Sequence, residues 1–223
     1  MIGTPRVHHR VTDSTNERAR ELAAAGAPHG TLVTADGQEA GRGRQGRVWT
    51  APPGSAVLMS LVLRELDELL PLTAAVAVCE ALPVEAGVKW PNDVWVDGRK
   101  VAGILVEGRP QEGWAVLGIG LNVTTDAFPA ELADTATSLR LAGADTTPEA
   151  VLSDLLASLS RWLDAPRDSV LAAWRSRDAL KGERVRWSGG EGIAGGIDDS
   201  GALVVETGDG RVTLDAGEVH LQR

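Results

Sequence analysis

A glycine- and arginine-rich run from Gly41 to Trp49 constrains this chain more than any other stretch of its sequence. Its letters, G-R-G-R-Q-G-R-V-W, gather three cations in a chain whose net charge is −9. Glycine allows backbone angles closed to other residues and lets main-chain N–H groups approach a ligand, while arginine offers a planar fork of donors to phosphate or carboxylate. The run therefore predicts an irregular loop that binds an anion.

The same letters match the G-x-G-x-x-G pattern of dinucleotide-binding loops, but the residues that follow exclude that fold. The fingerprint needs a helix directly after its last glycine, and the run that ends in Pro52-Pro53-Gly54 cannot begin one. A protein-kinase loop is excluded because no V-A-I-K, H-R-D or D-F-G segment follows. For this stretch alone, an exposed basic turn or a basic patch for nucleic acid remains the alternative.

The composition indicates a globular protein. With 223 residues, 43% of them hydrophobic, the chain can form one large domain or one domain with a small appendage. No apolar run approaches the roughly 20 residues that cross a bilayer, and no charged-then-apolar leader begins the chain, so we expect a cytoplasmic protein without a membrane partner. Cys79 is the only cysteine and the histidines lack metal-ligand spacing, so no metal site is expected. The acidic charge argues against a nucleic-acid partner.

A capped helix is predicted shortly after the N-terminus. Ser14 with Glu17 three residues later is a capping box, and an apolar pattern follows as far as Gly26. The presence of Ser14 or Thr15 can be explained by capping alone, in which the side-chain oxygen accepts from a backbone N–H group that has no partner within the helix. A helix N-terminus carrying small polar side chains is also a good place to receive polar ligand atoms, so both interpretations stay open.

The glycine- and arginine-rich loop is predicted to lie between two strands. Residues 30–35 and 55–63 have strand patterns, with Asp36-Gly37 as a turn after the first. A long connection of this kind is more often a functional flap than a passive linker. We expect it to be disordered when empty and ordered over its ligand. Residues 66–86 then contain an apolar helix that packs in the core.

A second informative segment follows, and it predicts a hairpin. Residues 94–96 and 101–106 are rich in β-formers and are joined by Asp97-Gly98, a strong hairpin signal. Lys100 therefore lies near the start of the second strand. Pro91 interrupts the preceding strand, which places Asn92 and Asp93 on a turn.

Glycines also interrupt the later strands. Gly103 within its strand indicates either close approach by a ligand or an ordinary bulge. Residues 114–123 form a further strand, and two helices are expected between Thr147 and about Arg177. After that, short β segments separated by glycine-rich turns predict a small barrel of about five strands, with a domain boundary near Lys181.

Taken in order, these segments resemble the biotin–protein ligases. The matching residues are Asp13-Ser14-Thr15-Asn16, Gln38, Gly41 to Trp49, Lys89-Trp90-Pro91-Asn92-Asp93, Arg99-Lys100, Ala102 to Glu107 and Gly118 to Val123. They span most of the first 125 residues. The resemblance implies an α+β fold, in which a mixed sheet with helices packed on one face, like the catalytic domain of a class II synthetase, occupies residues 1–180. Residues 181–223 would form the small C-terminal β-barrel domain.

The resemblance also implies a two-step ligation. Biotin's carboxylate attacks the α-phosphate of ATP, which comes with Mg²⁺, to give biotinyl-5′-adenylate. A lysine on the biotin carboxyl carrier domain of an acyl-CoA or acetyl-CoA carboxylase then takes the biotinyl group. Lys100 and Arg44 are the expected catalytic residues, because two anions must meet in the first step and fixed cations offset their repulsion.

The same resemblance assigns ligand contacts. Biotin would contact Ser14, Thr15, Asn16, Gln38, Gly41, Arg42, Gly43, Arg44, Lys100 and Gly103. ATP would contact Arg44, Arg47, Trp49, Asn92, Asp93, Lys100 and Asn122, with Asp93 helping to hold Mg²⁺.

Two departures from the family pattern matter. Asp13-Ser14-Thr15-Asn16 comes soon after Met1, so we expect a monofunctional enzyme without the N-terminal DNA-binding domain of some members, present as a monomer or weak homodimer. In some members a tryptophan after the position of Asn122 stacks on adenine, whereas Phe128 is the only aromatic residue between positions 123 and 141 of this sequence, so no residue is assigned to that contact. The alternatives are a lipoate or octanoate ligase or transferase of the same architecture, and a regulatory protein that binds DNA through the basic loop.

Overall fold

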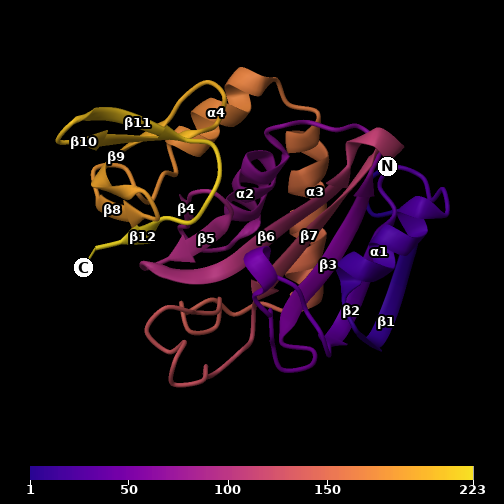
Figure 1. The fold of residues 1–223 in the computed structure, drawn as a ribbon. Coiled ribbons are helices and arrows are strands. Elements are labelled where there is room, and N and C mark those ends of the chain that lie inside the picture. The colour runs from indigo at the N-terminus through magenta and orange to yellow at the C-terminus, as the bar shows by residue number, and fades with distance from the viewer. Residues whose placement is uncertain (223) are drawn as a thin grey trace.

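The computed structural model describes residues 1–222, and a seven-stranded mixed sheet lies at its centre (Figure 1). Its strand order is β1-β2-β3-β7-β6-β5-β4. The strands are β1 (Arg6–Thr12), β2 (Leu32–Gln38), β3 (Ala56–Leu63), β4 (Gly87–Lys89), β5 (Asp93–Val96), β6 (Arg99–Arg109) and β7 (Trp114–Asn122). Only the β1–β2 pair of this sheet is parallel. The predicted mixed sheet is therefore confirmed.

Helices cover both faces of this sheet, although unequally. The helices are α1 (Thr15–Ala24), α2 (Leu70–Ala81), α3 (Pro148–Leu163) and α4 (Arg167–Arg175). Successive side chains of a strand point to opposite faces. Leu61 of β3 and Leu117 of β7 belong to the large core beneath α2 and α3, whereas Val62 and Val116, one residue away, pack against α1. The prediction that helices pack on one face holds for α2 and α3, but α1 lies on the other face.

The α1 face is only half covered, and the residue types of the strands explain why. Val62 and Val116 present apolar side chains to α1. Further along the same face of β3 and β7 come Ser60, Gly118 and Gly120, which offer little apolar surface for a helix to bury. The part of the sheet beyond the N-terminus of α1 is therefore left without a helical cover.

The local predictions near the site had different outcomes. Asp97 and Gly98 have φ values of 50° and 71°, as a hairpin turn with two left-handed residues requires, so the hairpin is confirmed. Asp36-Gly37 was wrongly predicted as a turn, because β2 continues through it to Gln38, which pairs with Thr12 of β1. Asp93 begins β5 instead of lying wholly on a turn.

A second sheet of five antiparallel strands follows α4, as expected. Its strands are β8 (Arg184–Trp187), β9 (Gly190–Ile197), β10 (Leu203–Thr207), β11 (Gly210–Leu214) and β12 (His220–Leu221), in the order β11-β10-β9-β8-β12. Val185 and Leu203 join the same core as α2. Trp90 donates from Nε1 to the carbonyl of Gly201 over 3.1 Å, which holds this sheet against the end of the first. Within residues 1–222, no helix has the length and apolarity to cross a membrane.

Candidate functional site

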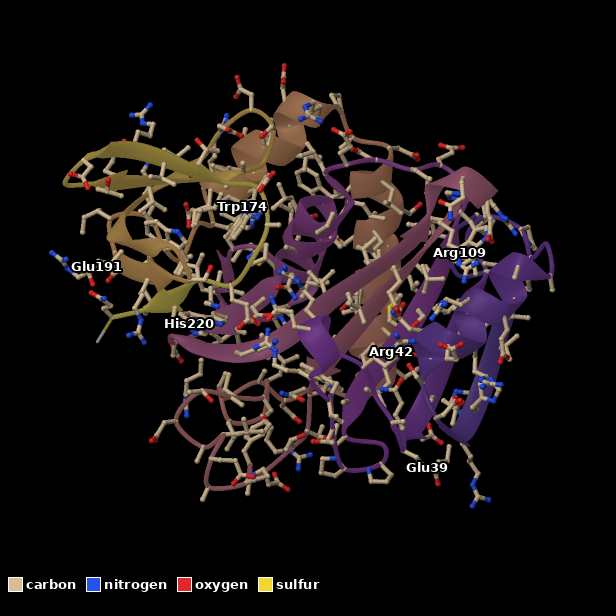
Figure 2. All side chains as sticks on the ribbon, in the orientation of Figure 1. Glu39, Arg42, Arg109, Trp174, Glu191 and His220 are labelled. Carbon is tan, nitrogen blue, oxygen red and sulfur yellow. The ribbon has the colours of Figure 1, made fainter. Side chains whose placement is uncertain are left out.

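A cavity of about 920 Å³ opens on the uncovered part of the α1 face. Glycines of β6 and β7 form its floor, and neighbouring residues occupy the space that larger side chains at these positions would need. A Cβ at Gly118 would collide with Oδ1 of Asn16, and one at Gly120 would lie 2.5 Å from the Trp49 ring. Arg42 from the Gly41–Trp49 flap and His220 from β12, both labelled in Figure 2, line this cavity from different parts of the fold.

One end of the cavity is lined by small polar side chains. Ser14, Thr15 and Asn16 at the start of α1 are all buried, and Gln38 ends the neighbouring strand β2. Thr15 donates to Oε1 of Gln38 from its backbone N–H over 2.7 Å and from its hydroxyl over 3.1 Å. Ser14 is the N-cap residue, but its side chain makes no capping hydrogen bond. Capping alone therefore does not account for Ser14, which favours the ligand-binding interpretation.

Asp13 fixes the chain just before this polar group. Its carboxylate accepts from the backbone N–H of Ser14 and from the guanidinium of Arg18, and these contacts lower the pKa of Asp13 to about 2. Because Ser14 is the next residue, the contact sets the direction in which the chain enters α1.

The other end of the cavity is cationic. Lys100 Nζ lies 2.7 Å from Oδ1 of Asp93, and Arg44 donates over 2.9 Å to Oδ1 of Asn92. Lys89 also lines this end. Burial lowers the pKa of Arg44 and of Lys89, and in both cases the charge of Asp93 opposes the shift. Half-buried cations gathered around one carboxylate create a positive potential that attracts anions.

Trp49 lies between the two ends, on the glycine floor. Lys100 Nζ is 5.6 Å from the centre of its ring, and a Cβ at Gly103 would approach the same ring at 3.2 Å. The indole Nε1 is buried without a hydrogen-bond partner among the described residues. Asn122 is similar, because its Nδ2 donates to the carbonyl of Thr137 while its buried Oδ1 has no partner in residues 1–222. Each leaves one polar atom for a ligand to satisfy.

The structure brings nearly all the predicted site residues together. Those that line the cavity are Ser14, Thr15, Asn16, Gln38, Arg42, Gly43, Arg44, Arg47, Trp49, Asn92, Asp93, Lys100, Gly103 and Asn122. Gly41 is the exception. It is buried at the base of the flap, where a Cβ would collide with the carbonyl oxygen of Trp49, so it lets the two ends of the flap approach each other. The ligand that each residue meets stays a prediction.

Several lining residues were not assigned from the sequence. Lys89 was part of a recognised motif but received no role. Phe128 and Leu132 lie on the connection between β7 and α3, and His220 comes from the second sheet. Spacing along the chain gives no signal for such distant contacts.

Two family models and several known proteins match this chain. Residues 8–123 match the Biotin/lipoate A/B protein ligase family, and residues 181–221 match the Biotin protein ligase C terminal domain. The bifunctional ligase/repressor BirA of Bacillus subtilis is 38% identical over 99% of this chain and 75% of its own length. The biotin–[acetyl-CoA-carboxylase] ligase of Mycobacterium tuberculosis is 37% identical over 95% of this chain and 87% of its own.

A solved structure also resembles this chain over almost its whole length. A biotin protein ligase from Aquifex aeolicus in complex with biotin and ATP superposes with a TM-score of 0.86 at 30% identity, covering 99% of both chains.

Proposed function

The chain belongs to the biotin/lipoate A/B protein ligase family and, within it, to the biotin–protein ligases, and from this premise we propose that it activates biotin with ATP and transfers it to a lysine of a biotin carboxyl carrier domain. The observation that carries the proposal is that Arg44 and Lys100 share one cavity with the polar group at the start of α1. An uncharged ureido ring suits that polar end, and the biotin carboxylate then reaches the cationic end.

The first step joins two anions. A carboxylate oxygen of biotin attacks the α-phosphorus of ATP, the bond to the pyrophosphate oxygen breaks, and pyrophosphate leaves. Lys100 and Arg44 reduce the repulsion between the reactants and stabilise charge on the α-phosphoryl oxygens in the transition state. No side-chain nucleophile is needed, so positioning and charge account for the catalysis.

The nucleotide fits the remaining surfaces of the cavity. The buried Oδ1 of Asn122 can accept from the exocyclic amine of adenine, and Phe128 offers an apolar edge nearby. Trp49 supplies a ring face and an unpaired donor between the two reactants. Arg47 and Asn92 lie where the phosphates would be held.

Magnesium would enter as a partner of ATP. No group of three or more His, Cys, Asp or Glu residues that could hold a metal occurs in the described chain, so most ligands of Mg²⁺ would be phosphate oxygens and water. Asp93 is the carboxylate best placed to contribute an oxygen, since it lines the cationic end. Bound there, Mg²⁺ would neutralise charge on the phosphates.

The second step needs protection from water and access for a protein. The amine of the carrier lysine attacks the anhydride carbonyl, AMP leaves with the bonding electrons, and the amine loses a proton. The flap covers the mixed anhydride until the carrier arrives, which limits hydrolysis and labelling of other amines. We place catalysis in residues 1–180, assign a supporting role to residues 181–223, and expect the reaction in the cytoplasm, where ATP is available.

The proposal is tested by incubating the purified chain with ATP, labelled biotin and a carboxylase carrier domain. We expect label on the carrier lysine and release of AMP and pyrophosphate. A parallel reaction with lipoate serves as the comparison. Adenylate formation from lipoate but not from biotin would reject the proposal in favour of a lipoate ligase.

A further inference from the structure

Glu107 lies behind the cavity and contacts two different parts of the site. It belongs to β6, four residues beyond Gly103, so its side chain lies on the same face of the sheet. Its carboxylate does not line the cavity. Oε2 accepts from Nδ2 of Asn16 over 2.9 Å, and Oε1 lies 3.0 Å from Nη2 of Arg42 in the flap. One carboxylate therefore bonds the polar end of the site through one oxygen and the flap through the other.

The bond to Asn16 determines how its amide is oriented. A carboxylate only accepts hydrogen bonds, so the amide nitrogen of Asn16 must face Glu107. The amide oxygen then accepts from the hydroxyl of Ser60 over 2.6 Å, and Ser60 is fully buried. Gly118 leaves no space for the amide to move toward the sheet. Without Glu107, the two orientations of the amide would differ much less in energy.

The bond to Arg42 holds the flap against the same strand. Arg42 lies 2.8 Å from Glu17 of α1 and 3.0 Å from Glu107 of β6. Arg20 pairs with Glu17 over 3.1 Å and completes this cluster. Of the two acidic residues, Glu107 is the one that also bonds Asn16, whereas Glu17 accepts from Arg20 and Arg42.

We propose that Glu107 is a positioning residue that couples recognition of the uncharged ring of biotin to docking of the flap, an inference that rests on the proposed function. A ligand that bonds Asn16 stabilises the orientation of its amide and, through it, the position of the Glu107 carboxylate. Arg42 then docks on a carboxylate that is already fixed. Biotin alone thus favours the closed flap before ATP arrives, and each event strengthens the other because coupling is reciprocal.

The test is trypsin cleavage of the flap after Arg42, Arg44 and Arg47, with and without saturating biotin. In the parent, biotin should slow cleavage by roughly 5-fold or more, because typical coupling free energies between two sites correspond to effects of at least that size. In Glu107→Gln the biotin effect should disappear, because an amide has only one acceptor oxygen for two donors. Glu17→Gln should speed cleavage without ligand, yet keep the biotin effect.

A matched control and a second measurement separate positioning from a general structural role. Glu112→Gln removes an ion pair with Arg109 on the same β6–β7 hairpin, outside the cavity, and should behave as the parent. The dissociation constant of biotin should rise about tenfold or more in Glu107→Gln. Adding Glu107→Gln to Asn16→Ala should not raise the dissociation constant of biotin above that of Asn16→Ala by itself, because Glu107 acts through Asn16.

The outcomes distinguish this inference from the proposed function. A parent that binds no biotin would reject the proposed function itself. Three results would overturn the coupling but not the proposed function. The parent could bind biotin without any slowing of cleavage in the flap, or biotin could protect Glu107→Gln as well as it protects the parent. The third is that Glu107→Gln and Asn16→Ala raise the dissociation constant of biotin additively. Where Glu107→Gln fails to fold, Glu107→Asp replaces it, since it keeps the charge but shortens the reach to Asn16 and should lose the same biotin effect.

Discussion

The ammonium group of Lys100 lies 2.7 Å from the carboxylate of Asp93, on the hairpin that closes one side of the cavity. The hairpin register brings them near each other, because Trp95 pairs with Lys100 and Asp93 pairs with Gly103. The ion pair holds a flexible lysine stem in one direction. An incoming carboxylate and phosphate would therefore meet a cation that is already in place, which is the condition for electrostatic catalysis.

Lys100→Ala should abolish nearly all adenylate formation. Loss of one preorganised donor at a developing charge typically costs about 100- to 1,000-fold in rate, and Lys100 would serve both reactants. The measurement is biotin-dependent exchange of pyrophosphate into ATP, together with labelling of the carrier. Lys181→Ala, outside the cavity, is the control and should keep parent activity. Exchange in Lys100→Ala within threefold of the parent would exclude a catalytic role for this residue.

Arg44→Gly should release the adenylate instead of blocking its synthesis completely. Arg44 joins the flap to Asn92 and, through Nη2, to the carbonyl of Gly217 on the connection between β11 and β12 over 3.1 Å. Without these bonds the flap retains the mixed anhydride poorly, and free adenylate acylates exposed amines. The measurement is label on a bystander protein that has no carrier domain. Arg211→Gly, which removes an ion pair with Glu206 in the second sheet, should cause no such labelling.

The sequence predicted the elements where local chemistry decides the outcome. Asp97-Gly98 became a hairpin turn because it joins two strands that pair with each other. Asp36-Gly37 has the same letters, yet it stays extended because β1 lies alongside and continues the pairing to Gln38. The face on which α1 packs could not be predicted, since an amphipathic pattern shows that a helix has a buried side but not which side of the sheet receives it.

The same distinction applies to the site. Motif residues of the flap and the hairpin line one cavity. That they belong to one site was expected from the resemblance to a family, because the local pattern of each motif does not show which distant segment it will meet. Glu107 belongs to a run that matches the family. Its two contacts, with residues of α1 and of the flap, could not be predicted, because they join segments that are far apart in the sequence. Glu218 and His220 are separated from the flap by most of the chain, and only the packing of the second sheet brings them close.

Gly120→Ala should weaken ligand binding without unfolding the protein. The added Cβ would lie 2.5 Å from Cε2 of Trp49, so the ring would have to leave the floor of the cavity. Displacement of a positioning group by about 1 Å can cost roughly 100-fold in rate, and we expect KM for ATP or biotin to rise at least tenfold. Gly208→Ala is the control, because a Cβ there meets nothing within 4 Å. Unchanged KM values in Gly120→Ala would show that the ring position is unimportant.

Glu218→Ala should loosen the flap from the connection between β11 and β12 of the second sheet. Glu218 forms an ion pair with Arg47, which is largely exposed. Exposed pairs contribute about 0.2 to 1 kcal/mol, so KM for ATP should rise by no more than about fivefold, with faster trypsin cleavage after Arg47 and little change in kcat. Glu206→Ala breaks an arginine pair within the same sheet and should change neither quantity. A large fall in kcat would instead give Glu218 a role in the chemistry.

Asp13→Asn should remove a pH-dependent part of the stability. The backbone N–H of Ser14 and then the guanidinium of Arg18 lower the pKa of Asp13 from 3.8 to about 2. A carboxyl group whose pKa is lower in the folded state stabilises the protein above its unfolded pKa, and this contribution is lost as the pH falls through the folded value. The difference in free energy of unfolding between parent and variant should therefore be constant above pH 5, narrow below pH 4 and vanish only below about pH 2. Because the side chain of Asp13 is 44% exposed, we expect at most about 1 kcal/mol.

Urea unfolding of both proteins across this pH range measures the difference. Arg18→Gln should remove only part of the same effect, because the contact with the Ser14 N–H remains and is the larger cause of the shift. A difference that stayed the same from pH 6 to pH 3 would mean that the Asp13 carboxylate gains nothing from its contacts on folding. The start of α1, and with it the polar end of the cavity, would then be held by the hydrogen bonds of Thr15 to Gln38 and of Asn16 to Ser60 and Glu107.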